Sequence, residues 1–263
     1  MANEAFQHAL EGLPSPNNKT VLEGKIDAVL IEENAVERQT KWNEILRVVH
    51  SGATTIPISG KTIPAVYNDA RLSSYVPGQQ QFDYPMHTLK VLDSNKNITV
   101  APGSQGGLFT GIGRGDPHTY RPNEFFFSNW IYEGLLEYGE DGELLPALAK
   151  NWSVAADGDG EIYSFTLRPD VTFHDGAKWN CSAALLNFNH IMAPPLRTGD
   201  WHGWYAFPGV LADADAFSCD EEVFKIKTKV KYYPLLQELT YIRPTRMLSP
   251  KKSTKWPRWA RSP

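Results

Sequence analysis

The sequence contains few cysteines, no long apolar run and no block of like charge, and each of these absences excludes a class of protein. With 2 cysteines in 263 residues, a framework of several disulfides and a cysteine-rich metal site are excluded. No apolar run approaches the ~20 residues that span a bilayer. The formal net charge of −4 is spread without basic or acidic blocks, so nucleic acid is not the expected partner. What remains is a folded globular protein, as the hydrophobic fraction of 41% also indicates.

Signatures of catalysis are also missing. The sequence has no GxSxG elbow, no HExxH and no CxxC, which are the local marks of many hydrolases and metal sites. The glycine-rich stretch GSQGGLFTGIGRGD lacks the Gly-Lys-Ser/Thr ending of a phosphate-binding loop. The adjacent His174 and Asp175 in FHDG are interpreted as a strand that ends in a turn. We therefore expect no enzyme activity, no resident cofactor and no metal site.

The two cysteines, Cys181 and Cys219, leave two alternatives. The favoured interpretation is a pair of small buried or half-buried thiols. A single disulfide would require an oxidising compartment. The N-terminus MANEAFQHALEGLPSP has no basic region followed by an apolar stretch, so we expect no signal peptide.

A pair of helices is predicted near the start of the chain. The first covers residues 20–33, and the second begins at Asn34 and ends at Gly52. Asn34 and Glu37 have the spacing of a capping box. Each helix carries one apolar stripe, formed by Leu22, Ile26, Val29 and Leu30 in the first and by Trp42, Ile45, Leu46 and Val49 in the second.

The segment after the helices, TTIPISGKTIPAVYND at residues 54–69, predicts two short strands around a Gly-Lys turn. Its prolines suit edge strands. A short strand is expected at 89–92, and DSNKN at 93–97 has the composition of a turn or linker.

The second part of the chain mixes strands and helices. A helix is predicted over RPNEFFFSNWIYEGLLEY at residues 121–138, and alternation in YSFTL and EVFKIKTKV predicts two half-buried strands. A helix capped by Asn180 and a short helix after Pro234 follow the same logic. The capped helix has Ala184, Phe188, Ile191 and Met192 spaced for burial. The fold class is therefore α/β or α+β.

Three residues suggest a binding site. Tyr120 lies in GDPHTYRP, Trp204 in DWHGWY and Arg243 in TYIRPTR. An arginine among aromatic side chains is a common way to hold a carboxylate by a bidentate contact. The alternative is that both aromatics are packing residues and the arginine is a surface cation.

Longer motifs resemble a known family. GDPHTYRPNEFFFSNWIYEGLLEYGEDGELLPALAKNWSV and IYSFTLRPDVTFHDGAKWNCSAALLNF are similar to the N-terminal part of family 5 solute-binding proteins. The resemblance runs from Ile98 to Pro250 and is strongest to the nickel-binding branch. AFQHALEGL, KIDAVL, ERQTKWNEILRVVHSGATTIPIS and QQFDYP resemble the C-terminal end of the same branch. The resemblance implies a C-terminal-type segment at 1–92, a junction at 93–97, an N-terminal-type segment at 98–250 and an atypical tail at 251–263.

The resemblance also implies a fold and a function. The expected fold is a partial large lobe of a type II periplasmic-binding-protein-like structure, permuted and without its second lobe. The expected function is ligand capture for an ABC importer of oligopeptides or a nickel chelate, in the periplasm or outside the cell, by a fragment or tandem-junction product. Tyr120, Trp204 and Arg243 would bind the ligand, an ABC permease would be the partner, and nickel would arrive only as transported cargo. Trp201 and Asn3 depart from the pattern, since the family has a basic residue and a histidine there. The alternative function is a structural or interaction module that retains the lobe fold.

Overall fold

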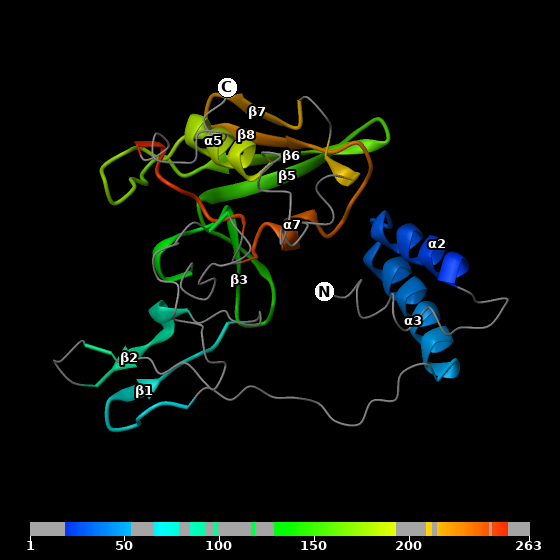
Figure 1. Cartoon of the computed structure of the whole chain (residues 1–263), viewed down its shortest axis with the longest axis horizontal. Helices are drawn as coiled ribbons and strands as arrows, with labels where there is room; N and C mark the ends of the chain where they lie inside the picture. The colour runs from blue at the N-terminus through cyan, green and yellow to red at the C-terminus, as the bar shows by residue number, and fades with distance from the viewer. Residues whose placement is uncertain are drawn as a thin grey trace. The chain divides into compact units, whose positions relative to one another are not determined.

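The structure is a computed structural model, and its chain divides into two compact units (Figure 1). Unit 1 consists of Met1–Pro64 and Val230–Pro234, and unit 2 of Ala65–Lys229 and Leu235–Pro263. The residues that the structure describes are 19–53, 66–78, 85–92, 97–98, 117–118, 129–192, 209–211, 215–241 and 244–251.

Unit 1 contains the predicted helix pair, α2 (Lys19–Leu30) and α3 (Ala35–Ser51). Asn34 begins α3 because its side-chain oxygen accepts the backbone N–H groups of Val36 and Glu37, at 2.9 and 3.2 Å. This N-cap is confirmed. The capping box differs from the prediction, because the backbone N–H of Asn34 donates to Glu32 Oε1 at 2.9 Å and no bond from Asn34 to the Glu37 carboxylate is present.

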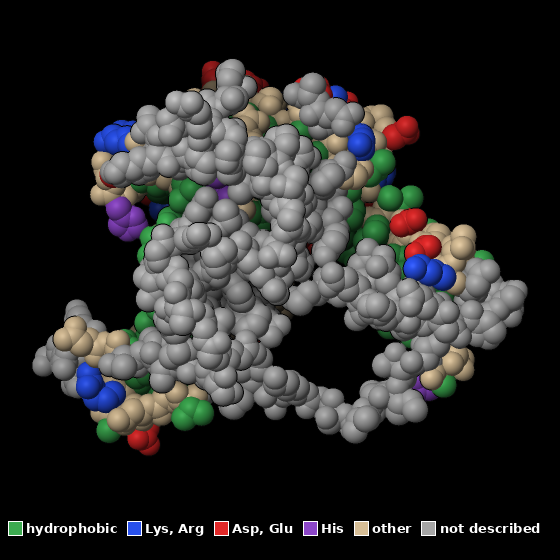
Figure 2. All heavy atoms as spheres, in the orientation of Figure 1, with side chains coloured by type: hydrophobic (Ala, Val, Ile, Leu, Met, Phe, Trp, Pro, Cys, Tyr) green, Lys and Arg blue, Asp and Glu red, His purple; other side chains and the backbone are tan. Residues whose placement is uncertain are grey.

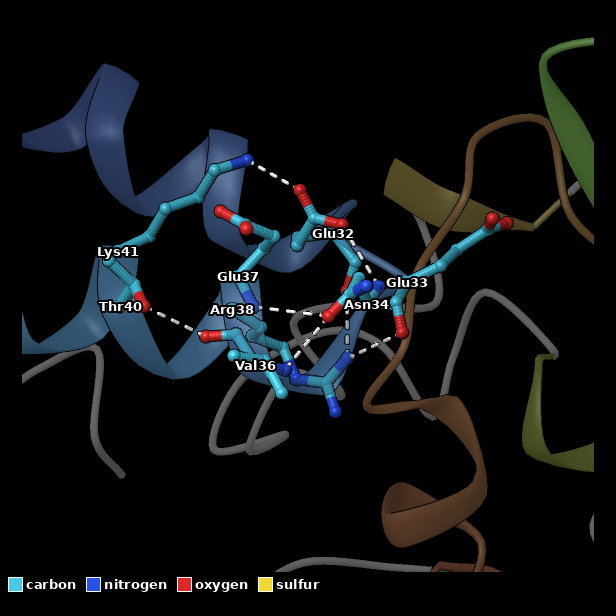
Figure 3. Close-up of polar contacts among 8 residues, drawn as sticks. All are labelled: Glu32, Glu33, Asn34, Val36, Glu37, Arg38, Thr40 and Lys41. Atoms are coloured by element: carbon cyan, nitrogen blue, oxygen red, sulfur yellow. Dashed lines mark hydrogen bonds and ion pairs between the residues drawn. The ribbon is translucent and has the colours of Figure 1, made fainter.

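The turn between the helices is held by side chains on both sides of it (Figure 3). Lys41 Nζ donates to Glu32 Oε2 at 2.7 Å, and Arg38 Nη1 donates to the backbone carbonyls of Glu32 and Glu33 at 2.8 and 3.2 Å. The hydrogen bond from Lys41 is the main reason that the pKa of Glu32 lies below its ordinary value. Acidic and basic side chains also lie side by side over the helix pair in Figure 2.

The core of unit 1 is the apolar seam between the two helices. Leu22, Val29 and Ile45 are fully buried there, and half-buried side chains pack around them. Those partners are Ile26, Trp42, Val48, Val49 and Tyr233. The predicted stripe is wrong at Leu46, which is 47% exposed, because the seam follows Ile45 and its neighbours three and four residues away.

Unit 2 is built on an antiparallel sheet in the order β5-β6-β8-β7 (Figure 1). Its strands are β5 (Ala149–Asp157), β6 (Gly160–Leu167), β8 (Val223–Lys227) and β7 (Phe217–Asp220). The alternation predicted in β6 is confirmed, since Tyr163, Phe165 and Leu167 are buried. The β5–β6 turn places Gly158 at φ 62°, a region that glycine adopts without strain.

Helix α5 (Cys181–Ile191) packs on this sheet, as Figure 1 shows. Asn180 caps it by accepting the Ala183 N–H at 2.9 Å, as predicted. The Phe188 ring lies 5.2 Å from that of Phe217 and 4.8 Å from that of Phe224. Aromatic pairs at these separations contribute beyond the area they bury. The predicted apolar face is therefore confirmed at its centre, while Met192 at its end is only half-buried.

The favoured interpretation of two thiols is wrong, because Cys181 and Cys219 form a disulfide. Cys181 begins α5 and Cys219 lies in β7. Packing of α5 against the edge of the sheet brings their Cα atoms within 5.8 Å, a separation that suits a disulfide.

The predicted helix over 121–138 is wrong at its end. Leu136–Tyr138 forms strand β3, which pairs antiparallel with β4 (Leu144–Pro146). The two strands pair from Leu136 opposite Pro146 to Tyr138 opposite Leu144, and this pairing decides the conformation. Strand β4 lies beyond a turn in which Gly142 has φ 81°. Local apolar spacing does not contain this information.

The remaining described elements are short. They are β1 (Leu72–Ser74), the 3-10 helix η1 (Met86–Thr88), β2 (Lys90–Val91) and α7 (Leu235–Glu238). The predictions of a strand near 89–92 and of a short helix after Pro234 are confirmed. FHDG also forms the expected turn, between the bridged residues Thr172 and Lys178. Most of the segment 54–69 in which two strands were expected lies outside the described residues, as do most of the junction and nearly all of the tail. The end of the second expected strand, Val66 and Tyr67, is described and is not in a strand.

Candidate functional site

The three predicted ligand residues, Tyr120, Trp204 and Arg243, lie outside the described residues. Their mutual geometry therefore stays a prediction. Their neighbours are described: His118 comes two residues before Tyr120, and Pro244 directly follows Arg243. The candidate site described below therefore consists of these neighbours and their contacts in unit 2.

A buried cluster joins two of these neighbouring segments. His118 Nε2 lies 2.8 Å from the backbone carbonyl oxygen of Arg246, and His118 Nδ1 lies 2.5 Å from His190 Nδ1. His118 is 1% exposed and His190, near the end of α5, is 2% exposed. The chain before Tyr120 is thus bonded to the chain after Arg243.

The contacts determine which ring nitrogens carry hydrogen. A carbonyl oxygen only accepts, so His118 Nε2 is the donor toward Arg246. In a neutral ring the other nitrogen, His118 Nδ1, is then the acceptor. His190 Nδ1 therefore carries the hydrogen of the contact between the two rings.

Burial keeps His118 neutral. Loss of hydration lowers the pKa of His118 from 6.5 to about 4, although the bond to the Arg246 carbonyl opposes that change. At neutral pH the ring is therefore an uncharged donor and acceptor. A histidine of this kind suits the positioning of chain segments better than proton transfer near pH 7.

The Arg246 side chain is held from two other segments. Its Nε donates to Asn129 Oδ1 at 2.7 Å, and its Nη2 donates to the Thr240 carbonyl at 3.0 Å. Gly134 allows this packing, since a Cβ there would lie 2.3 Å from Nη1 of Arg246. Arg246 is 5% exposed, so its guanidinium is part of the scaffold.

The segment after Arg243 is fixed along its length. Asn187 of α5 accepts the Leu248 N–H at 2.7 Å and donates to the Leu248 carbonyl at 2.9 Å. Ser249 Oγ donates to Asp175 Oδ2 at 2.7 Å, and Lys251 Nζ donates to the Asp175 carbonyl at 2.9 Å. The chain that leaves Arg243 is therefore bonded both to α5 and to the turn of FHDG.

These contacts hold the chain segments beside Tyr120 and Arg243 in place. Within the described ranges, no group of three or more histidine, cysteine or acidic side chains is arranged to hold a metal. His118 lies in the motif GDPHTYRP, but neither His118 nor His190 nor Arg246 is among the site residues that the sequence predicts. Their partners lie up to 128 residues away, and no local pattern marks them.

Comparison with known proteins identifies the larger part of unit 2. A family model for bacterial extracellular solute-binding proteins, family 5 Middle, matches residues 143–261. These residues therefore resemble family 5 solute-binding proteins, and the sequence identity to a nickel-binding periplasmic protein given below agrees with this. The family 5 region contains α5, the sheet strands β5 to β8, α7 and the Arg246 segment, and so carries most of the scaffold described above.

The chain is also similar to several named proteins. The nickel-binding periplasmic protein of Escherichia coli (strain K12) is 37% identical over 139 residues, which are 53% of this chain and 25% of the relative. The glutathione-binding protein GsiB of Pectobacterium atrosepticum is 33% identical over 67 residues, 26% of this chain and 13% of the relative. NikA from Brucella suis, solved in complex with Fe(III)-EDTA, is 34% identical over 52% of this chain and 26% of that chain, with a TM-score of 0.45.

The chain spans a quarter or less of the length of these curated relatives. The family model and the curated relatives are described as solute-binding, nickel-binding and glutathione-binding proteins. In the part of the chain that the structure describes, none of the helices combines the length and the apolar character needed to cross a bilayer.

Proposed function

We propose that this chain is a solute-binding component of an ABC-type importer, with a nickel chelate or an oligopeptide as its ligand. The observation that carries the proposal is the family match over 143–261 together with 37% identity to a nickel-binding periplasmic protein. The Cys181–Cys219 disulfide supports an extracytoplasmic location, since disulfides persist in oxidising compartments.

Tyr120, Trp204 and Arg243 are the proposed ligand residues. The aromatic rings would pack on the ligand, and the guanidinium would bind a carboxylate of a peptide or of a metal chelate. The scaffold supports this assignment for two of them, because the bond between His118 and Arg246 fixes the segments beside Tyr120 and Arg243. The nickel ion would arrive as cargo in the chelate.

Affinity is expected to be low for this chain alone. Two-lobed receptors close over a ligand and draw contacts from both lobes. With the contacts of one lobe, we expect a dissociation constant in the millimolar range, which corresponds to about −4 kcal/mol. Ligand-detected NMR is suited to that range.

The test compares nickel–histidine complexes and short peptides against the full chain and against Arg243→Gln. Transfer of magnetisation from protein to ligand is expected with the natural sequence and should be lost with Arg243→Gln. Arg168→Gln is the matched control, because this arginine has a partly exposed side chain whose ion pair is with a nearby residue, Asp170, at 3.0 Å. No signal from any ligand with the natural chain would contradict the proposal and favour an interaction module.

A further inference from the structure

Unit 1 joins the helix pair to a segment that lies far away in the sequence. Val230–Pro234 belongs to unit 1, although the residues on both sides of it belong to unit 2. The helix pair lies outside the region matched by the family model, whereas Val230–Pro234 lies within it. The contacts between them therefore link the family 5 region to a part of the chain that precedes it.

Tyr233 is the centre of these contacts. Its backbone N–H donates to the Leu30 carbonyl at 3.2 Å, and its hydroxyl oxygen accepts from Trp42 Nε1 at 3.3 Å. Its ring packs against the core formed by Leu22, Val29 and Ile45. Tyr233 thus contacts the end of α2 through its backbone, and the middle of α3 and the seam between the helices through its side chain.

Charged groups complete the same surface. The Arg38 guanidinium carbon lies 4.1 Å from the centre of the Tyr233 ring, a cation–π separation. Lys231 Nζ forms an ion pair with Glu33 Oε1 at 2.6 Å. The surface therefore offers an apolar seam, an indole donor, a cation and an acid to a segment that supplies a tyrosine and a lysine.

We propose that α2 and α3 form a docking surface for Val230–Pro234 of the same chain, and that docking persists without the covalent connection through residues 54–65. The resemblance to family 5 indicates that the N-terminal and C-terminal parts of this chain stand in reversed order. Contacts of the helix pair with Lys231 and Tyr233 then hold these two parts together. This inference concerns assembly of the chain and does not depend on the identity of a ligand.

The experiment cuts the folded full-length chain. A protease-recognition sequence inserted at Gly60 allows cleavage after purification, and size-exclusion chromatography over a dilution series measures whether the N-terminal piece stays bound. We expect the two pieces to elute together at micromolar concentration. Separation of the pieces immediately after cleavage would overturn the proposal.

Variants distinguish this surface from other contacts of the N-terminal piece. Tyr233→Ala should weaken association at least about tenfold, since truncation removes an aromatic contact at the centre of the surface. Tyr67→Ala, which removes an exposed tyrosine of unit 2, is the control and should have no effect. Equal association with Tyr233→Ala and with the natural sequence would overturn the proposal.

A charge exchange covers the case in which Tyr233→Ala does not fold. Lys231→Glu should weaken association about two- to fivefold, because exposed ion pairs are individually weak, and Glu33→Lys in the same chain should restore it. Failure of the exchange to restore association would count against the proposal. Light scattering of the uncut chain should give a monomer, and a dimer would overturn the commitment to a segment of the same copy.

Discussion

Reduction of the Cys181–Cys219 disulfide should lower the stability of unit 2 substantially. The bond closes a loop between two residues that are 38 apart in the sequence. In the chain-entropy description, a cross-link over a loop of this length removes about 13 cal/mol/K from the unfolded ensemble, or about 4 kcal/mol at 25 °C. Domains have only about 5–15 kcal/mol of stability in total, so the loss is a large fraction.

The effect of reduction on the folded state itself should be small. Cys181 is 4% exposed and lies where α5 meets β7. Reduced thiols fill nearly the same volume as the disulfide, so most of the effect should come from the unfolded chain. Replacement of both cysteines by alanine adds a small packing loss, and this variant should therefore be slightly less stable than the reduced natural chain.

Urea unfolding followed by circular dichroism and tryptophan fluorescence measures the effect. With a slope of about 2–3 kcal/mol/M, the midpoint should fall by about 1.5 M on reduction. Reductant should leave the midpoint of the double alanine variant unchanged, which controls for effects of the reagent. A thiol titration establishes that the bond is reduced before unfolding begins.

An unchanged urea midpoint in a sample whose thiols titrate fully would refute this prediction. That result would mean that the reduced, unfolded chain already holds these two residues together, or that strain in the bond offsets its effect. A change of the same size in the double alanine variant on addition of reductant would show that the reagent, and not the bond, is responsible.

Four further predictions concern single residues. The free energy of unfolding should fall by about 3 kcal/mol as pH drops from 6.5 to 4. The reason is that the pKa of His118 is lowered to about 4 in the fold, so the unfolded chain takes up the proton first. In a profile of urea midpoint against pH, His118→Gln should flatten this part. Gly134→Ala should lower the free energy of unfolding by about 1–3 kcal/mol in thermal unfolding, since its methyl group would overlap a buried guanidinium. Gly24→Ala in α2, where a Cβ would have nothing within 4 Å, should raise it by about 1 kcal/mol. Asn34→Ala should lower helix stability by about 1 kcal/mol through loss of the cap, measured by circular dichroism.

Each of these predictions has an outcome that contradicts it. A pH profile of His118→Gln that matches the natural chain would remove the histidine as the cause. A thermal midpoint for Gly134→Ala equal to that of the natural chain would mean that the Arg246 side chain moves aside at no cost. An unchanged helix signal in Asn34→Ala would show that packing of the seam alone holds the start of α3.

Local patterns predicted the elements whose causes are local. The cap at Asn34, the alternation in β6 and the apolar face of α5 each follow from residues within one or two turns or pleats of one another. The mixed class of the fold followed from these elements. Conversely, the end of the predicted helix at Tyr138 failed because its strand partner lies across a turn.

The scaffold beside the predicted ligand residues depends on contacts between distant residues. His118 and Arg246 are separated by 128 positions, and Trp42 and Tyr233 by 191. Neither pair has a sequence motif that links its members. The disulfide was underestimated for the same reason, because only the packing of α5 on the sheet brings Cys181 to Cys219.

Asn187 gives α5 a second role besides packing on the sheet. Its side-chain amide both accepts from and donates to the backbone of Leu248, so it supplies the same pair of bonds as a neighbouring strand would. The segment that follows Arg243 therefore pairs with a side chain of α5 rather than with a strand. Opening of α5 would therefore remove both bonds at once, so the chain beside the proposed ligand residue should lose its support together with the helix.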